Sequence, residues 1–104
     1  MTVRYKTGDW TVDSSTMPRT GPGGYDQETD AMLDFASDCK VDGSAPFGAL
    51  LGRSTADPER LPYRRVNREW SFRAARDGTV GLRVNDACVN DNRGALTVTV
   101  VVTR

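Results

Sequence analysis

The clearest periodic pattern of the chain is an alternation of apolar and polar residues near the C-terminus. The apolar positions are Leu96, Val98, Val100 and Val102, and threonines occupy most of the positions between them. Successive side chains of a strand point to opposite faces of a sheet, so this pattern predicts a strand with one buried face. The same alternation in residues 80–84 predicts a second strand.

Further strands are predicted upstream, separated by glycine and proline. Residues 69–84 form a predicted hairpin, because alternating segments flank the turn at Asp77-Gly78. Residues 47–51 are a short apolar run, which is typical of a buried strand. Weaker alternation predicts strands in residues 2–5 and 10–12. Five or six short strands with turns between them predict an all-β sandwich.

Two stretches do not follow a strand pattern. Residues 17–30 contain two prolines and three glycines, so we expect an irregular loop, and loops of this length in a compact domain are usually functional or disordered. The apolar residues within 30–39 are spaced for about one and a half helical turns, which predicts a short helix.

The charge of the chain argues against a nucleic-acid partner. An arginine-rich run surrounds Tyr63, and its members are Arg60, Arg64, Arg65 and Arg68. Such a run could hold phosphates and stack a base. However, 14 Lys and Arg balance 14 Asp and Glu, so no long-range field draws the molecule toward nucleic acid or an anionic membrane. These arginines are therefore interpreted as surface cations.

Length and composition limit the function classes further. The 104 residues are expected to form a single domain, residues 1–104. The chain has no histidine, which excludes Ser/His/Asp and Cys/His nucleophile pairs and zinc sites with imidazole ligands. No apolar run approaches the roughly 20 residues that span a bilayer. Residues 1–6 lack the apolar stretch of a secretory signal, so no export label is expected.

The two cysteines, Cys39 and Cys88, allow one intramolecular pairing. Their number is compatible with a disulfide in an oxidising compartment or with two inert thiols. A disulfide would favour an extracellular location. The loop between the two cysteines is long enough for a bond to stabilise the fold by roughly 4 kcal/mol.

A polar loop between the two C-terminal strands carries the most chemistry. Residues 85–94 read Asn-Asp-Ala-Cys-Val-Asn-Asp-Asn-Arg-Gly, with two carboxylates and three carboxamides. Their oxygens are hard donors of the kind that Ca²⁺ selects, and a cation would relieve the repulsion between the two carboxylates. The alternative is structural, because Asn and Asp also form their own backbone turns. The spacing of the acidic residues excludes an EF-hand.

The order of these motifs resembles the PA-IL (LecA)-type calcium-dependent galactose-binding lectins of bacteria. The resemblance rests on the segments at residues 45–53, Ala-Pro-Phe-Gly-Ala-Leu-Leu-Gly-Arg, at residues 77–86, and at residues 91–98, Asp-Asn-Arg-Gly-Ala-Leu-Thr-Val. Residues 8–13 and 21–25 look like the first binding loop of that family. The most specific part is the Asn-Asp, short gap, Asp-Asn-x-Gly loop between two strands.

The resemblance implies a small jelly-roll-like β-sandwich, galactose-binding-like, with long polar loops at one end. It implies one Ca²⁺ bridged by two adjacent hydroxyls of a galactose-type glycan. The implied metal ligands are Asp13, Asp86, Cys88, Val89, Asp91 and Asn92, with one backbone carbonyl coming from Asp13 and another from either Cys88 or Val89. The implied sugar contacts are Asp13, Gln27, Glu28, Asp86, Asp91 and Asn92. Some members also carry cysteines at the positions of Cys39 and Cys88, which favours the disulfide.

The chain differs from the family pattern at three places. The first is its Asn-Asp loop, which is shorter than in the best-known lectin of this type and leaves open which carbonyl of the loop binds the ion. The family has a further strand ahead of the position of Met1, so either the reading frame extends upstream or the sheet has an edge beside residues 2–5 that a second copy could cover. A homo-oligomer is therefore among the expected partners. Arg93 occupies a position that is usually small or polar, where its guanidinium could pair with Asp91 and compete with the ion.

The sequence thus predicts a non-enzymatic, calcium-dependent carbohydrate-binding module. A first alternative is a structural or protein-interaction domain that is stabilised by Ca²⁺ and does not bind sugar. A second is a hydrolase that uses Asp86 and Asp91 as acid and base. The enzyme is the least favoured, because no second cluster of catalytic groups accompanies those carboxylates.

Overall fold

Strands dominate the fold of this chain. The computed structural model describes residues 1–56, 63–74, 77–88 and 92–102. Its elements are β1 (Thr2–Thr11), α1 (Gln27–Ala31), the 3₁₀ helix η1 (Asp34–Cys39), β2 (Leu50–Ser54), β3 (Arg64–Arg65), β4 (Glu69–Ser71), β5 (Val80–Val84) and β6 (Arg93–Val101). The predicted all-β class is confirmed. Among the described helices, none has the length and apolar character to cross a membrane.

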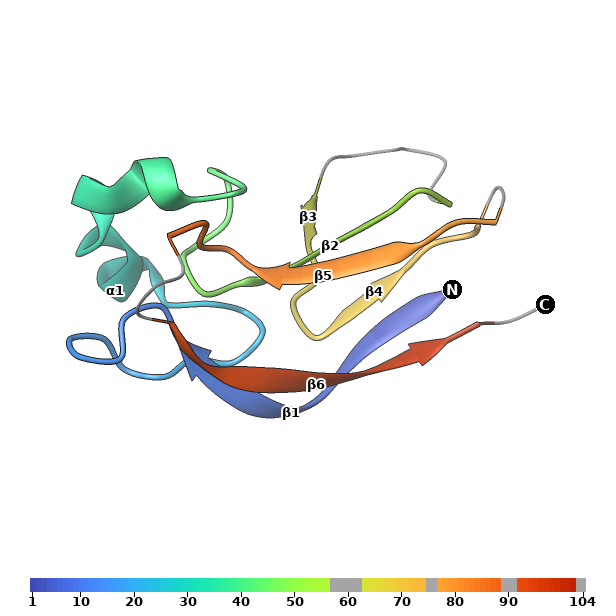
Figure 1. The fold of residues 1–104 in the computed structure, drawn as a ribbon, viewed down its shortest axis with the longest axis horizontal. Coiled ribbons are helices and arrows are strands. Elements are labelled where there is room, and N and C mark those ends of the chain that lie inside the picture. The colour runs from blue at the N-terminus through green and yellow to red at the C-terminus, as the bar shows by residue number, and fades with distance from the viewer. Residues whose placement is uncertain (57–62, 75–76, 89–91, 103–104) are drawn as a thin grey trace.

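Within the described residues, the strands form two antiparallel sheets of three strands each. Their strand orders are β4-β1-β6 and β3-β2-β5. β1 pairs with β6 along its whole length, from Thr2 opposite Val101 to Thr11 opposite Arg93. Figure 1 shows β1 and β6 as one layer and β2 and β5 as another. This arrangement is sandwich-like.

The main core lies between these two sheets. Its buried residues are Val3, Leu50, Val66 and Trp70, and Leu82, Leu96 and Val98 pack against them. The alternating residues of β5 and of the first part of β6 therefore face the core as predicted, because each contributes apolar surface to one side of a sheet. The C-terminal part of β6 does not. Val100 is 45% exposed and Val102 is 61% exposed, so the predicted buried face ends at Val98.

The predicted hairpin of residues 69–84 is wrong. β4 pairs with β1, where Val3 lies opposite Trp70, and β5 pairs with β2 in the other sheet. The Trp70 side chain reaches the same core from β4 that Leu82 reaches from β5. The two segments thus bury their apolar faces against each other across the core rather than side by side in one sheet.

Two predicted strand boundaries also change. Residues 2–5 and 10–12 do not form separate strands, because β1 runs continuously from Thr2 to Thr11. The expected unpaired ladder beside residues 2–5 is absent, because β1 pairs with both β4 and β6 and the Tyr5 N–H donates to the Arg68 carbonyl at 2.7 Å. The predicted strand at residues 47–51 begins only at Leu50. Gly48 before it has a φ of 78°, which is outside the strand region.

The predicted irregular loop is held against the sheets by backbone pairing. Isolated bridges join Trp10 to Thr20 and Gly23 to Ala49. The loop ends at α1, a short helix that falls inside the stretch expected to be irregular, and the predicted helix that follows is η1. Only one face of this helical segment is apolar and buried, since Leu33 is 8% exposed whereas Phe35 is 88% exposed.

The arginine-rich run packs against aromatic rings. The guanidinium carbon of Arg64 lies 5.8 Å from the ring centroid of Trp70, and that of Arg68 lies 5.4 Å from the ring centroid of Tyr5. Arg65 instead donates to the Gly23 carbonyl at 2.6 Å. Arg60 lies outside the described residues. These contacts are structural cation–π and hydrogen-bond interactions.

Candidate functional site

The end of β1, the end of β5 and both helices meet at one end of the molecule, opposite the two chain termini (Figure 1). A recess of about 130 Å³ opens there. It is lined by Asp13, Asp86 and Cys88 together with Val12, Leu33, Phe35, Ala36, Cys39 and Phe47. The structure therefore brings three of the sequence-predicted ligands, Asp13, Asp86 and Cys88, to one recess. Val89 and Asp91 lie outside the described residues.

Asp86 is a buried charged residue of this site and is only 3% exposed. Its backbone N–H donates to the Val84 carbonyl at 2.9 Å, and its Oδ1 accepts from the Cys88 N–H at 2.9 Å. Asp86 thus forms the backbone turn that the structural interpretation of the loop expected. A carboxylate in such a buried position attracts a cation more strongly than one in water, because the local dielectric is lower.

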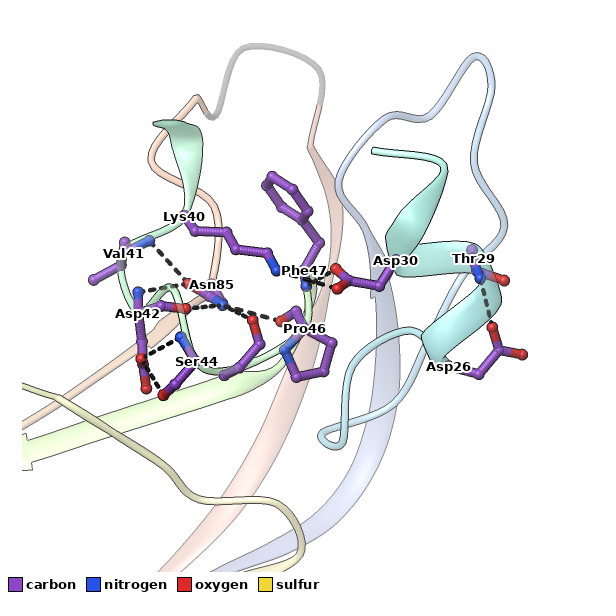
Figure 2. Close-up of polar contacts among 11 residues, drawn as sticks. Asp26, Thr29, Asp30, Lys40, Val41, Asp42, Ser44, Pro46, Phe47 and Asn85 are labelled. Carbon is purple, nitrogen blue, oxygen red and sulfur yellow. Dashed lines mark hydrogen bonds and ion pairs between the residues drawn. The ribbon is translucent and has the colours of Figure 1, made fainter. Parts of the chain in front are cut away.

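Asn85, the residue before Asp86, anchors the loop to the neighbouring segment. Its side chain is fully buried, and its Oδ1 accepts from the N–H groups of Val41 and Asp42 at 2.9 and 3.0 Å. Its Nδ2 lies 3.0 Å from the carbonyl oxygens of Asp42, Ala45 and Pro46 (Figure 2). This carboxamide is wholly used by the fold, so it is a positioning residue for Asp86.

A partly buried ion pair next to residues 41–46 also anchors this part of the chain. The Nζ of Lys40 lies 3.1 Å from the Oδ2 of Asp30, and the two side chains are only 12% and 19% exposed. The Oδ1 of Asp30 accepts from the Phe47 N–H at 2.7 Å, as Figure 2 shows. Because both carboxylate oxygens are engaged, Asp30 links α1 to the turn before β2. This pair and Asn85 fix the backbone on which the recess is built.

A disulfide joins Cys39 at the end of η1 to Cys88, with a Cα–Cα distance of 5.4 Å. The prediction of this bond is confirmed. A backbone hydrogen bond from Ala87 N–H to the Cys39 carbonyl, at 2.6 Å, connects the same two segments. The disulfide is compatible with an extracellular location.

Asp13 reaches the recess from the chain just after β1, but its polar atoms are already engaged. Its carboxylate accepts hydrogen bonds from the Ser15 N–H, the Ser15 hydroxyl and the Thr16 hydroxyl. Together, with the Thr16 hydroxyl the largest contributor, these bonds lower the pKa of Asp13 below its ordinary value of 3.8. Its carbonyl accepts from Thr11 Oγ1 and from two N–H groups, those of Thr16 and Met17. The carbonyl predicted to bind an ion therefore already serves a turn.

Asn92 lines a neighbouring recess of about 100 Å³, beside Trp10, Thr11 and Val84. Its Oδ1 and Nδ2 are both buried and have no hydrogen-bond partner within the part of the chain that the structure describes. The two recesses are built on the same two segments, since residues 10–11 and 84 line one and residues 12–13 and 86 line the other. Asn92 and Asp86 thus occupy the same end of the sheets.

Gln27 and Glu28 lie apart from Asp86. They are the first two residues of α1, whose N-terminus is capped by the Asp26 carboxylate accepting from the Thr29 N–H at 2.8 Å. Both side chains are exposed. Gln27 lines a separate recess of about 400 Å³ that also includes Lys40 and Arg65. The structure does not bring either residue to the recess of Asp86.

Three features of the site were missed by sequence reasoning. The pairing of Asn85 with residues 41–46 and that of Lys40 with Asp30 join segments distant in the chain, and no local pattern indicates them. The third is Phe35, one of the apolar residues whose spacing predicts the short helix in residues 30–39. It is exposed at the rim of the recess. The available signal was its position two residues after the buried Leu33, because residues two apart lie on opposite sides of a helix.

The arrangement combines a buried carboxylate, a carboxamide whose buried polar atoms have no partner among the described residues, and an exposed aromatic ring. Such a set can contribute oxygen ligands to a hard cation and an apolar surface to a small ligand. Comparison of the chain with protein-family models, with curated proteins and with solved structures found no match.

Proposed function

We propose that this chain is a calcium-dependent carbohydrate-binding module for galactose-type sugars, without enzymatic activity, built on a jelly-roll-like sandwich. The resemblance of its loops to the PA-IL (LecA)-type lectins gives the ligand class. The observation that carries the proposal is the Asn92 carboxamide, whose Oδ1 and Nδ2 atoms are buried and have no hydrogen-bond partner among the described residues. The residues Asp86 and Asn92 belong to the loop that the resemblance assigns to the ion.

An unpartnered buried carboxamide costs about 1–3 kcal/mol, so a fold keeps one where a ligand completes it. Asn92 offers an acceptor in Oδ1 and a donor in Nδ2. A cation alone would engage only Oδ1. A cation together with a sugar hydroxyl would engage both atoms, with Nδ2 donating to the hydroxyl oxygen. Asn92 therefore favours the joint binding of ion and sugar over the binding of an ion alone.

The donor set suits Ca²⁺ and leaves it incomplete. Asp86 and Asn92 supply side-chain oxygens, and the sequence places Asp91, the Val89 carbonyl and the Cys88 carbonyl in the same loop. Ca²⁺ takes six to eight oxygen ligands, which is more than these residues provide. When bound, the ion would coordinate adjacent sugar hydroxyls in its remaining positions. The engaged carbonyl of Asp13 makes that residue the weakest member of the set.

Phe35 supplies a surface for the body of a sugar ring. Its side chain is 88% exposed and lies at the rim of the recess that Asp86 lines. The face of an aromatic ring is electronegative, so it attracts the C–H groups on the apolar face of a galactose ring.

A second candidate function is a calcium-stabilised structural or protein-interaction domain that does not bind sugar. The observation in its favour is the separation of Gln27 and Glu28 from the recess of Asp86. Without these residues, fewer polar groups would read the sugar. In that case Asn92 Nδ2 would have no partner of the kind that we propose.

Calorimetric titration of the oxidised protein separates these functions. Galactose is titrated in buffer with Ca²⁺ and in buffer with a calcium chelator, and glucose serves as the matched sugar that differs at one hydroxyl. Binding of galactose that requires Ca²⁺ and exceeds that of glucose is the expected result. Binding of Ca²⁺ without any sugar supports the second candidate. Absence of Ca²⁺ binding contradicts both.

A further inference from the structure

We propose that the reduced form of this protein binds Zn²⁺ through the thiolates of Cys39 and Cys88 and the carboxylate of Asp86. The Sγ atoms of the two cysteines and a carboxylate oxygen of Asp86 all lie within 4.8 Å of one another. In the oxidised form the two sulfurs are bonded to each other and cannot act as thiolates. The inference does not rest on the binding of Ca²⁺ or sugar.

The ligand types select a different ion from the one proposed above. Two soft thiolates with one carboxylate suit Zn²⁺, which accepts both sulfur and oxygen ligands, whereas Ca²⁺ takes oxygen ligands only. Zinc–sulfur bonds of about 2.3 Å in a tetrahedral site place two sulfurs about 3.8 Å apart. Rotation of the two side chains can provide this separation, because the Cα atoms of Cys39 and Cys88 are already 5.4 Å apart.

The cluster is held together by contacts other than the disulfide. The Ala87 N–H donates to the Cys39 carbonyl at 2.6 Å, so the chain segments of both cysteines remain tethered when the sulfur–sulfur bond is broken. The neighbouring Asn85 carboxamide fixes the start of the same loop to residues 41–46. Reduction therefore frees the thiols while these anchors keep the three ligands in one place.

The recess supplies the fourth position of a tetrahedral site. All three ligands line it, and its volume of about 130 Å³ exceeds the roughly 30 Å³ that one water occupies in the liquid. Cys88 is exposed, which gives an ion a path from solvent. Three protein ligands and one water complete the coordination of zinc.

Zinc binding is then controlled by the redox state of the cysteines. A phosphine reductant transfers two electrons to the disulfide, water supplies the oxygen of the phosphine oxide and two protons, and two thiols result. Zinc displaces the two thiol protons as it binds. Asp86 belongs to both proposed metal sites, so one molecule cannot bind Zn²⁺ and Ca²⁺ through it at the same time. The reduced protein would bind Zn²⁺ there, and the oxidised protein would bind Ca²⁺.

The test uses Co²⁺ as a spectroscopic substitute for Zn²⁺ in protein reduced with a phosphine. We expect a thiolate-to-cobalt charge-transfer band and the visible bands of tetrahedral cobalt, both removed by added Zn²⁺ and absent from oxidised protein. The variant Asp86→Asn should weaken Zn²⁺ binding about tenfold or more. The matched control is Asp38→Asn, which removes an exposed carboxylate beside Cys39 and should leave binding unchanged.

Circular dichroism of the same samples excludes binding by an unfolded chain. The proposal requires that reduced, metal-loaded protein keeps its β-sheet signal and melts at a higher temperature with Zn²⁺ than without it. It is overturned if reduced protein shows no charge-transfer band, if Asp86→Asn binds Zn²⁺ as tightly as Asp38→Asn, or if the band arises only in protein that has lost its sheet signal. Failure of galactose to bind would leave the proposal untouched.

Discussion

Asn85 and Asp86 are neighbours in the chain and both are buried, but their side chains serve different parts of the molecule. The Asn85 carboxamide is hydrogen-bonded to the backbone of residues 41–46, whereas the Asp86 carboxylate lines the recess beside Cys88. One residue of the pair therefore holds the loop and the next presents a charge. Substitutions at these two positions should separate stability from ligand binding.

Replacement of Asn85 tests the structural half of this pair. Asn85→Ala removes the side-chain partner of five backbone N–H and carbonyl groups around a fully buried position. The free energy of unfolding should therefore fall by about 3 kcal/mol or more. The comparison variant is Asp42→Ala, whose carboxylate accepts from Ser44 at the surface, and it should lose only about 1 kcal/mol. Urea unfolding measures both. Equal losses would contradict the anchoring role of Asn85.

The pH dependence of the first loop follows from the hydrogen bonds to Asp13. Because the folded pKa lies below the unfolded value of about 3.8, the ionised carboxylate contributes stability above that pH, and the contribution is lost as the pH falls through the folded pKa. Thr16→Val should raise the pKa of Asp13, since the Thr16 hydroxyl is the largest cause of its shift. An NMR titration of the Asp13 carboxyl carbon measures this. Ser14→Ala is the control and should not change the pKa.

Local sequence patterns predicted the strands whose buried face is indicated by the alternation of their own apolar and polar residues. The alternation in residues 80–84 and 96–98 corresponds to side chains that reach the core, as Leu82 and Leu96 do. The pairing of β4 was not predictable in this way. Trp70 follows the same alternation whether it pairs with a neighbour in sequence or with Val3, and only the competition for the core between the sheets decides which occurs.

The candidate site was likewise predictable only in part from the sequence. The oxygen-rich loop and the position of Asp86 in it were visible in the sequence, because donor chemistry is a property of residue types. Burial was not visible. The full burial of Asn85 depends on carbonyl groups of residues 42–46. The exposure of Phe35 depends on η1 burying the face that continues from Leu33 and leaving the opposite face, which carries Phe35, in solvent. Both are set by tertiary contacts.

Asn92→Leu should make the protein more stable and remove its proposed function. Leucine has the same branching and the same number of side-chain heavy atoms as asparagine but no polar atoms. It therefore abolishes the penalty of burying Oδ1 and Nδ2, which have no hydrogen-bond partner among the described residues. We expect the melting temperature without Ca²⁺ to rise, and the calcium-dependent binding of galactose to disappear. Differential scanning calorimetry and sugar titration on one preparation measure both effects. A loss of stability would mean that Asn92 has partners that the ligand does not provide.

Asp86 and Arg93 should have opposite effects on Ca²⁺ binding. A ligand at a hundredfold excess over its Kd stabilises the folded form by about 2.7 kcal/mol, which raises the melting temperature by several degrees in a domain of this size. Asp86→Ala should show no such rise, because it removes a buried anionic ligand. Arg93→Ser should keep or increase the rise, because it removes an exposed cation beside Asn92. A full calcium shift in Asp86→Ala would place the ion elsewhere.

Phe35 should separate sugar binding from ion binding. Its ring is 88% exposed and makes little contribution to the core, so Phe35→Ala should leave the melting temperature and the affinity for Ca²⁺ unchanged. It should weaken the binding of galactose by about tenfold, since aromatic contacts are worth about 0.5–1.5 kcal/mol beyond the area that they bury. Met32→Ala is the matched control, because Met32 is also exposed, at 67%, near the start of η1 and does not line the recess. Titration of galactose in Ca²⁺ buffer compares the two variants. If both bind galactose as the unmodified protein does, the sugar does not rest on this ring, and the aromatic surface at the rim has no part in recognition.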